Sequence, residues 1–319
     1  MTRRDFLHLT ATTTGAAALA SRHSAAPVRV AESSIPVIDT HIHLYDPTRP
    51  EGVPWPPKTD ALLYRPYLPD TYQAVTAELD VVGSIVVEAS SWPEDNQWVL
   101  DLAAKHSGIV GLVGNLTPGR AEFAAALTRF AANPLFRGVR LRAADLQKIG
   151  DPVFDADLRR VADADLSVDV LGGVATIEAA RKLARVTPTL RIVVNHLPFK
   201  DWDGQPDALR TALAPLASLR QVFIKGSDVM RRSGTTVIED PAYYAPGLEA
   251  LIDLFGPDRI IFGSNWPVSE RVAPYATLHR VLSEYFKRHT RTLAENYFWR
   301  NSYRAYRWQA RGAAAALLQ

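Results

Sequence analysis

Short apolar runs rich in valine and isoleucine alternate with longer amphipathic stretches along the chain from Ile35 onward. This alternation predicts repeated strand and helix units around a parallel sheet, because each change of period marks a change of element. The expected strands are residues 35–40, 83–88, 109–114, 136–142, 166–171, 191–196, 221–226 and 258–264. Eight strands that alternate with helices are the count of a closed barrel, so we expect an α/β fold of the (β/α)8 TIM-barrel type.

Helix-like segments follow the expected strands, near residues 70–80, 94–106, 120–132, 155–164, 174–187, 207–217, 241–255 and 273–288. Several begin with Asp, Pro or Thr, as helices often do. The stretch 291–308 is rich in Tyr, Phe and Trp and is expected to form a C-terminal aromatic-rich helix that packs on the barrel. We therefore assign residues 35–308 to one barrel domain and residues 309–319 to a C-terminal tail.

Composition is compatible with one such domain. The 319 residues are 47% hydrophobic and 22% charged, which is typical of a globular protein with a substantial core. The chain has no cysteine, and this excludes disulfides, thiolate metal ligands and a cysteine nucleophile.

The first 26 residues resemble a twin-arginine export signal. Arg3 and Arg4 precede a mild apolar stretch from Leu9 to Ala20, and small residues near Ala20 and Ala26 are typical of cleavage sites. The stretch is too short and too rich in Thr, Gly and Ala for a stable membrane anchor. We expect a removable signal, a linker over 27–34 and a periplasmic or secreted protein; a disordered basic tail is the alternative.

Charge argues against nucleic acid as a partner. The formal net charge is +2, and residues 1–26 hold three arginines and one aspartate, so the remainder of the chain has a net charge of zero. Basic residues are interspersed with acids, as at Arg159 and Arg160 near Asp157 and Asp163, and no long basic stripe occurs. We expect a small-molecule substrate as the partner, and a homo-oligomer is compatible with the sequence.

Histidines recur where the expected strands end. His41 and His43 follow an apolar run and are two residues apart, so both imidazoles project from one side of a strand. Such a pair is half of a zinc-type site, although hydrogen-bonded histidines at a barrel mouth would give the same pattern. His196 ends a second apolar run and Asn265 a third. The C-terminal strand ends of a barrel form its active-site face, so these residues are expected to converge.

Further candidates lie on other strands and loops. Arg140 and Arg142 share one face, from which they either grip a carboxylate or oxyanion inside the barrel or form salt bridges with helices outside it. Lys225 lies near a strand end, where its amine could neutralise a developing alkoxide. The expected substrate contacts are Arg140, Arg142, Glu88, Trp55 and Trp266.

Two long excursions are expected near the barrel mouth. The loop from Tyr45 to Tyr67 holds six prolines and Trp55 directly after the histidine pair, which favours a pocket wall or lid over a simple surface loop only slightly. The segment from Arg231 to Tyr244 is expected to cover the same mouth.

Taken together, the segments VIDTHIHLYDP, FRGVRLR, RIVVNHLP, VFIKGSD and FGPDRIIFGSNWPVS, followed by ENYFWRNSYRAYRW, resemble the amidohydrolase superfamily. The resemblance is to its amidohydrolase-2 branch, which contains sugar lactonases, dicarboxylate-lactone hydrolases and related decarboxylases, and it covers about residues 35–308. It implies that His41, His43 and His196 bind a metal or contact substrate. It also implies that an aspartate at position 265 handles the proton of the attacking water.

Position 265 departs from that pattern, because it is Asn. A carboxamide has no usable basicity and no charge to offer a dication, so the substitution is expected to weaken metal binding and to remove the general base. One weakly held zinc and a metal-free site are both compatible with the sequence. His196, Glu88 and Asp228 are alternative bases, and Asn265 is a candidate hydrogen-bond donor to an oxyanion or hydroxyl. The expected catalytic residues are His196, Asn265 and Lys225.

The sequence therefore predicts an exported hydrolase that opens a lactone or similar cyclic ester of a sugar acid or small carboxylic acid. Two alternatives remain at this point. One is a metal-independent lactone isomerase or lyase, and the other is a catalytically silent protein that binds a small molecule. The identity of the product distinguishes hydrolysis from isomerisation.

Overall fold

A computed structural model describes residues 34–171, 176–196 and 205–319 of the chain. The expected export signal at residues 1–26 and nearly all of the expected linker at 27–34 lie outside these described residues. Within the described part of the chain, no helix has the length and apolar character needed to cross a membrane.

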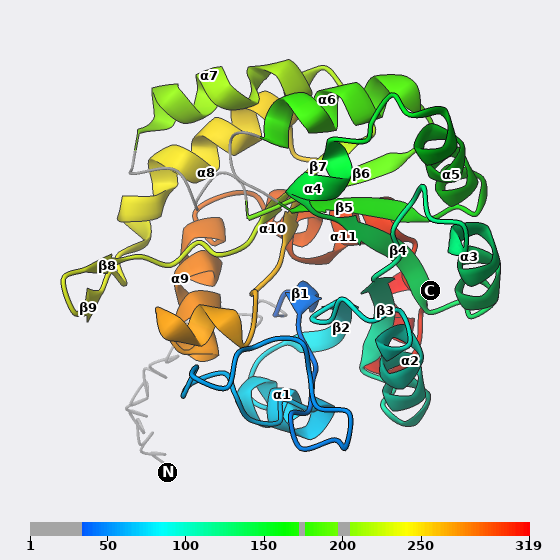
Figure 1. The fold of residues 1–319 in the computed structure, drawn as a ribbon. Coiled ribbons are helices and arrows are strands. Elements are labelled where there is room, and N and C mark those ends of the chain that lie inside the picture. The colour runs from blue at the N-terminus through cyan, green and yellow to red at the C-terminus, as the bar shows by residue number, and fades with distance from the viewer. Residues whose placement is uncertain (1–33, 172–175, 197–204) are drawn as a thin grey trace, which may run out of the picture. The chain divides into compact units, whose positions relative to one another are not determined.

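The described residues form a parallel eight-stranded sheet in the order β1-β2-β3-β4-β5-β6-β7-β10 (Figure 1). Its strands are β1 (Val37–Ile42), β2 (Val81–Val87), β3 (Ile109–Gly114), β4 (Phe136–Leu141), β5 (Ser167–Leu171), β6 (Arg191–Asn195), β7 (Val222–Gly226) and β10 (Ile260–Phe262). A bridge between Ile42 and Trp266 joins the last strand end to the first. The predicted TIM barrel is confirmed.

Helices surround this sheet, as Figure 1 shows. They are α1 (Pro69–Thr76), α2 (Asp95–Lys105), α3 (Phe123–Ala131), α4 (Ala143–Leu146), α5 (Pro152–Asp163), α6 (Ile177–Val186), α7 (Pro206–Ala217), α8 (Pro241–Phe255) and α9 (Tyr275–Phe286). Their apolar faces and the outer faces of the strands form one large buried cluster. This layer of side chains holds the ring of helices on the barrel.

The last strand is shorter than the predicted 258–264, because the chain changes its partner after Phe262. Thr40 donates a hydrogen bond to the carbonyl of Phe262 at 2.5 Å, and the backbone N–H of Asn265 donates to the carbonyl of His41 at 2.8 Å. Gly263 allows this close approach to β1, since a Cβ added there would lie 2.9 Å from the Cβ of His41. The end of β10 is therefore packed directly on the histidine strand.

The aromatic tail fills the barrel interior. It consists of α10 (Arg291–Glu295), the π-helical turn η3 (Asn296–Arg300) and α11 (Asn301–Tyr306), so the expected terminal helix contains a bulge. Trp299, Tyr306 and Trp308 belong to the same buried cluster as the inward-facing strand residues Ile38 and Ile85. These rings fill the barrel core together with the inward-facing strand residues.

The excursion from Arg231 to Tyr244 contains a short antiparallel hairpin. Its strands, β8 (Arg232–Ser233) and β9 (Thr236–Val237), have two residues each. The other excursion is tied at its base, because Tyr45 and Tyr67 exchange backbone hydrogen bonds of 3.0 and 2.9 Å. A short 3-10 helix, η4 (Gly312–Leu318), ends the chain. Both excursions begin at the C-terminal ends of strands, which is the face where barrel sites form.

Candidate active site

A cavity of about 580 Å³ opens at the C-terminal ends of the barrel strands. Eight of the residues singled out in the sequence line it: His43, Trp55, Glu88, Arg140, Arg142, His196, Asp228 and Asn265. Asp228 follows β7, and Leu171 at the end of β5 also lines the cavity. The cavity is thus built from strand ends far apart in the sequence, as the barrel geometry predicts.

Three histidine rings lie together at the floor of this cavity. The ring centroid of His41 is 4.4 Å from that of His196 and 4.9 Å from that of His43. His43 and His196 line the cavity, whereas His41 is fully buried beneath them. The predicted convergence of the histidines is therefore what the structure shows, with His41 set one layer lower.

His43 is held in one tautomer by its two neighbours. Its Nδ1 lies 2.9 Å from the carbonyl oxygen of Val87, so Nδ1 carries the hydrogen and donates it. The side chain of Asn265 hydrogen-bonds the same imidazole, and the lone pair of Nε2 is the acceptor left for its amide N–H. Burial, together with the nearby charge of Arg140, lowers the pKa of His43 to about 3. His43 is therefore neutral at physiological pH.

Three consecutive barrel strands lead into residues with left-handed backbone conformations. These are His196 after β6 (φ 56°), Asp228 after β7 (φ 61°) and Asn265 after β10 (φ 60°). All three line the cavity. Positive φ is uncommon outside glycine, although Asn, Asp and His adopt it more readily than other residues. This turn of the backbone brings each side chain to the cavity wall.

Arg140, Arg142 and Glu88 form an ion-pair cluster on the opposite wall. One terminal nitrogen of Arg142 lies 2.7 and 2.8 Å from the two carboxylate oxygens of Glu88. Arg140 lies 3.9 Å from the same carboxylate and 3.3 Å from the carbonyl of Glu88. Burial raises the pKa of Glu88, and the two arginines oppose that rise. Both arginines face the cavity, which decides between the two orientations left open by the sequence.

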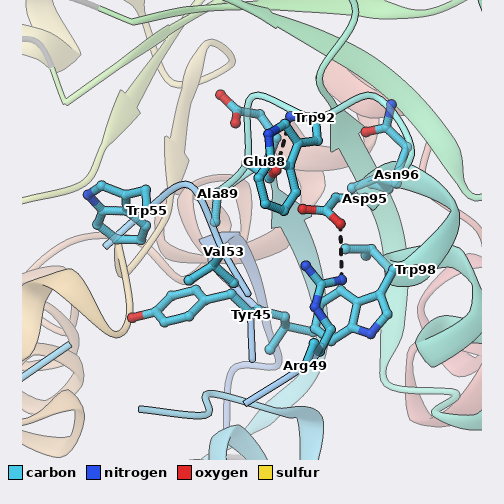
Figure 2. A pocket seen from close by; sticks show the side chains of 14 residues that line it. Tyr45, Arg49, Val53, Trp55, Glu88, Ala89, Trp92, Asp95, Asn96 and Trp98 are labelled. Atoms are coloured by element: carbon cyan, nitrogen blue, oxygen red, sulfur yellow. Dashed lines mark hydrogen bonds and ion pairs between the residues drawn. The ribbon is translucent and has the colours of Figure 1, made fainter. Parts of the chain in front are cut away.

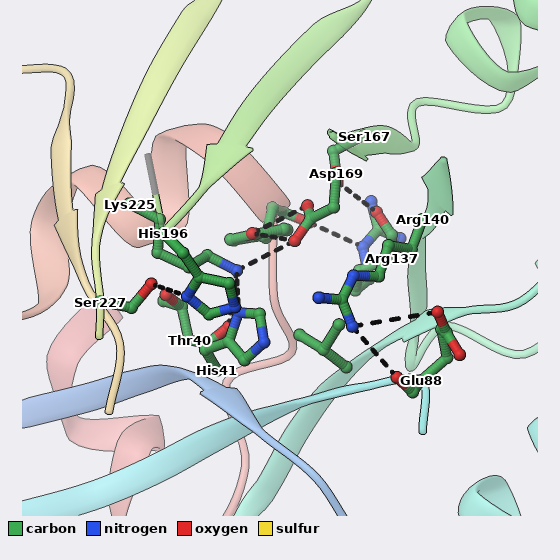
Figure 3. A network of polar contacts seen from close by, with 12 residues as sticks. Thr40, His41, Glu88, Arg137, Arg140, Ser167, Asp169, His196, Lys225 and Ser227 are labelled. Atoms are coloured by element: carbon green, nitrogen blue, oxygen red, sulfur yellow. Dashed lines mark hydrogen bonds and ion pairs between the residues drawn. The ribbon is translucent and has the colours of Figure 1, made fainter. Parts of the chain in front are cut away.

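Lys225 lies beneath the cavity and does not line it. Figure 3 shows its side chain beside His41 and Asp169. Its ammonium is 2.9 Å from Asp169 and 3.3 Å from Nδ1 of His41, and both partners of the ion pair have 0% side-chain exposure. Tyr306 donates its hydroxyl to the two oxygens of Asp169 at 2.9 and 3.0 Å. Burial lowers the pKa of Lys225 to about 8, against the opposing effect of Asp169.

Asp39 fixes the histidine strand to the last strand. Its carboxylate accepts backbone N–H groups from His41 at 3.1 Å and Ser264 at 2.9 Å. It also accepts the hydroxyls of Tyr72 and Tyr275 at 2.9 and 3.1 Å. These four contacts give Asp39 a structural role beneath the histidines.

The two tryptophans differ in position. Trp55 lines the cavity, with its ring centroid 5.8 Å from that of His43. Trp55 also lines a side pocket of about 20 Å³, in which Arg49 pairs with Asp95 at 3.0 Å. Figure 2 shows this pocket from close by. Trp266 is fully buried and donates its indole N–H to Glu270 at 2.9 Å. Only Trp55 is placed to touch a ligand in this cavity.

The histidine cluster does not fit a bound divalent metal. Across the described ranges, no three His, Cys, Asp or Glu side chains are arranged to hold one. A histidine that ligates a metal donates its second N–H to a carboxylate or carbonyl, whereas His41 points its Nδ1 at an ammonium group. The Nε2 of His43 is engaged by Asn265, which brings no negative charge.

Sequence reasoning missed Asp169 and Tyr306. Asp169 interrupts the apolar run SVDVL, and a charge in the middle of a buried strand is a signal that could have been used. Tyr306 carried no such signal, since it was one aromatic residue among several in the tail.

This protein is a (β/α)8 barrel with histidines and arginines around a cavity at its C-terminal face. That arrangement is typical of one class of barrel enzymes. Residues 38–308 match the amidohydrolase family model, and the chain belongs to this family.

Relatives with assigned activities support that membership. An L-fucono-1,5-lactonase of Burkholderia ambifaria is 31% identical over 236 residues, which cover 73% of this chain and 80% of the relative. An L-fucono-1,5-lactonase of Burkholderia multivorans is 28% identical over 252 residues, which cover 75% and 84%. The structure of an amidohydrolase from Burkholderia multivorans with bound zinc has a TM-score of 0.75 at 23% identity, covering 86% of this chain and 99% of that one. This last likeness concerns the fold.

Proposed function

We propose that this protein is a hydrolase that opens lactones, with the lactone of a sugar acid or a small carboxylic acid as its substrate. The observation that carries the proposal is the cavity of about 580 Å³, in which two arginines face neutral histidine and amide groups across the strand ends. Such a lining offers many hydrogen bonds to an oxygen-rich ring. Two relatives that span most of the chain are lactonases, which supports the same substrate class.

Arg140 supplies the fixed positive charge for the lactone carbonyl. It is buried in the cavity wall, and its closest carboxylate, that of Glu88, is 3.9 Å away and already held by Arg142. A cation that needs no reorganisation stabilises the oxyanion formed when water attacks the carbonyl carbon. Asn265 lies on the histidine side of the cavity, where the part of its amide that does not contact His43 orients the ring hydroxyls by hydrogen bonds.

Asp228 is the general base in this proposal. Among the described residues, two carboxylates line the cavity, and that of Glu88 is neutralised by Arg142, which leaves Asp228 to accept the proton of the attacking water. His196 lies on the same wall, and its Nδ1 is 2.8 Å from the hydroxyl of Ser227. The carboxylate that position 265 lacks is thus supplied from the neighbouring strand end.

The test is turnover of a panel of sugar lactones, with acid release followed in the presence and absence of a chelator and the product identified by NMR. We expect ring opening to a free acid, and a loss of kcat of at least about 100-fold in Asp228→Asn. Asp101→Asn, an exposed carboxylate on α2, is the matched control and should retain wild-type kcat. An isomerised lactone, or no acid from any member of the panel, would contradict the proposal.

We also propose that the protein is exported, on the basis of the paired Arg3 and Arg4 and the apolar stretch that follows them. The measurement is the distribution of the full-length chain between cell fractions, with an Arg3→Lys, Arg4→Lys double variant beside it. Export of the wild type that is blocked in the variant supports the proposal, and retention of both proteins in the cytoplasm contradicts it.

A further inference from the structure

The ammonium group of Lys225 has three donors and three acceptors around it. Its Nζ lies 2.9 Å from a carboxylate oxygen of Asp169, 2.9 Å from the carbonyl oxygen of Thr40 and 3.3 Å from Nδ1 of His41. The side chain is fully buried, so water does not compete for these positions. Because an ammonium only donates, the Nδ1 of His41 must be an acceptor.

The tautomer of His41 follows from that contact. A neutral imidazole carries one hydrogen, and with Nδ1 as acceptor the hydrogen is on Nε2. The ammonium of Lys225 lies 3.3 Å from Nδ1 and donates to it, so that nitrogen has no room for a second ring hydrogen. The Nε2 of His41 is buried and finds no hydrogen-bond partner among the described residues. A buried donor without an acceptor is costly, unless a ligand supplies one.

The position of that donor connects it to the cavity. The ring of His41 does not itself line the cavity, but its centroid is 4.9 Å from that of His43 and 4.4 Å from that of His196, which both line it. On the other side, Asp169 is held by Lys225 and Tyr306, so the carboxylate that could otherwise support a metal-ligating histidine is already committed to an ammonium. Lys225 therefore occupies the position behind His41 that an acceptor takes in a metal site.

We propose that Lys225 is a positioning residue that holds His41 as an Nε2–H donor aimed at a ligand oxygen and, by doing so, keeps a divalent cation out of the histidine cluster. The positive charge under the cavity is then that of a lysine side chain and not that of a bound metal ion. The donor role of His41 toward an oxyanion rests on the proposed lactone hydrolysis, but its tautomer and the exclusion of metal do not.

The tautomer is tested on the full-length wild-type protein by ¹⁵N NMR of the histidine rings, with His41 assigned through bonds from its backbone. We expect the His41 signals of a protonated Nε2 and an unprotonated Nδ1. A protonated Nδ1 would overturn the proposal. This measurement needs no variant to fold and no substrate, so its result is independent of the lactone assays.

Exclusion of metal is tested by calorimetric titration with zinc chloride of the wild type, Lys225→Met and Lys182→Met. Methionine keeps the length of lysine without its charge, and Lys182 is an exposed lysine on α6 that serves as the matched control. We expect Lys225→Met to bind zinc at least about 10-fold more tightly than the wild type, and Lys182→Met to match the wild type. Equal zinc affinity in folded wild type and Lys225→Met would show that Lys225 does not exclude a divalent cation from the three histidines.

Discussion

Two ion pairs of the barrel, one at the cavity wall and one beneath the cavity floor, are built differently. Arg142 and Glu88 meet at 2.7 Å, with 44% of the arginine side chain exposed. Lys225 and Asp169 meet at 2.9 Å with both side chains at 0% exposure. A ligand that enters the cavity can exchange contacts with the first pair, whereas the second pair is sealed by the strands and the aromatic tail.

The difference teaches what burial does to an ion pair in this fold. A sealed pair loses its hydration and depends on hydrogen bonds to its remaining atoms, which here come from Tyr306 and from the carbonyl of Thr40. Such a pair is fixed in geometry and suits the task of orienting His41. The pair at the wall keeps one member in water and suits recognition, because its cost of rearrangement is small.

The variant with the largest expected effect on the two ion pairs is Asp169→Asn. It leaves the ammonium of Lys225 buried without its carboxylate, and we expect the free energy of unfolding to fall by about 3–5 kcal/mol. Chemical denaturation of both proteins measures this. Asp165→Asn is the control, since Asp165 pairs with Arg191 while 64% exposed and should change stability by no more than about 1 kcal/mol. Equal losses in the two variants would contradict the distinction between sealed and open pairs.

Arg140→Met tests the cavity wall. The fixed cation beside the lactone carbonyl is lost, so we expect kcat/KM to fall about 100-fold, as for removal of one preorganised oxyanion donor. Steady-state kinetics on the best lactone of the panel measure it. Arg160→Met removes a half-exposed arginine on α5 and should leave kcat/KM unchanged. Unaltered kinetics in folded Arg140→Met would remove Arg140 from the mechanism.

The smallest effect is a pH dependence at the wall. Burial raises the pKa of Glu88 above 4.5 in the folded protein, so the folded state holds this proton more tightly than the unfolded state. The contribution to stability is complete below pH 4.5 and is lost as pH rises through the folded pKa. We therefore expect the stability of the wild type relative to Glu88→Gln to decrease as pH rises from about 4 to 7. A difference that grows with pH would mean that the arginines outweigh burial.

Much of the fold follows from the sequence, because each strand of a parallel barrel is buried on both faces and appears as a continuous apolar run. The cavity residues could be predicted for a related reason, because polar side chains such as His196 and Arg140 occur at the ends of those apolar runs. The family resemblance added position 265, whose significance is invisible without the pattern that it breaks.

What escaped prediction depends on contacts across long stretches of chain. The pairing of Lys225 with Asp169 joins residues 56 positions apart, and Tyr306 reaches the same carboxylate from 137 positions away. Local pattern placed Lys225 near a strand end and therefore near the chemistry. The three-dimensional structure is needed to show that its side chain points into the barrel core. Neither its spacing nor its polarity in the sequence predicts whether a residue lines the cavity or lies beneath it.

The left-handed backbone at His196, Asp228 and Asn265 affects how this cavity can be dissected by mutation. Alanine at such a position loses the side chain and also meets a steric penalty of about 1–2 kcal/mol, so an alanine scan would mix chemistry with backbone strain. Glycine adopts the same φ freely, although it makes the unfolded chain more flexible. At these three strand ends, glycine and not alanine is the neutral baseline against which the work of each side chain can be measured.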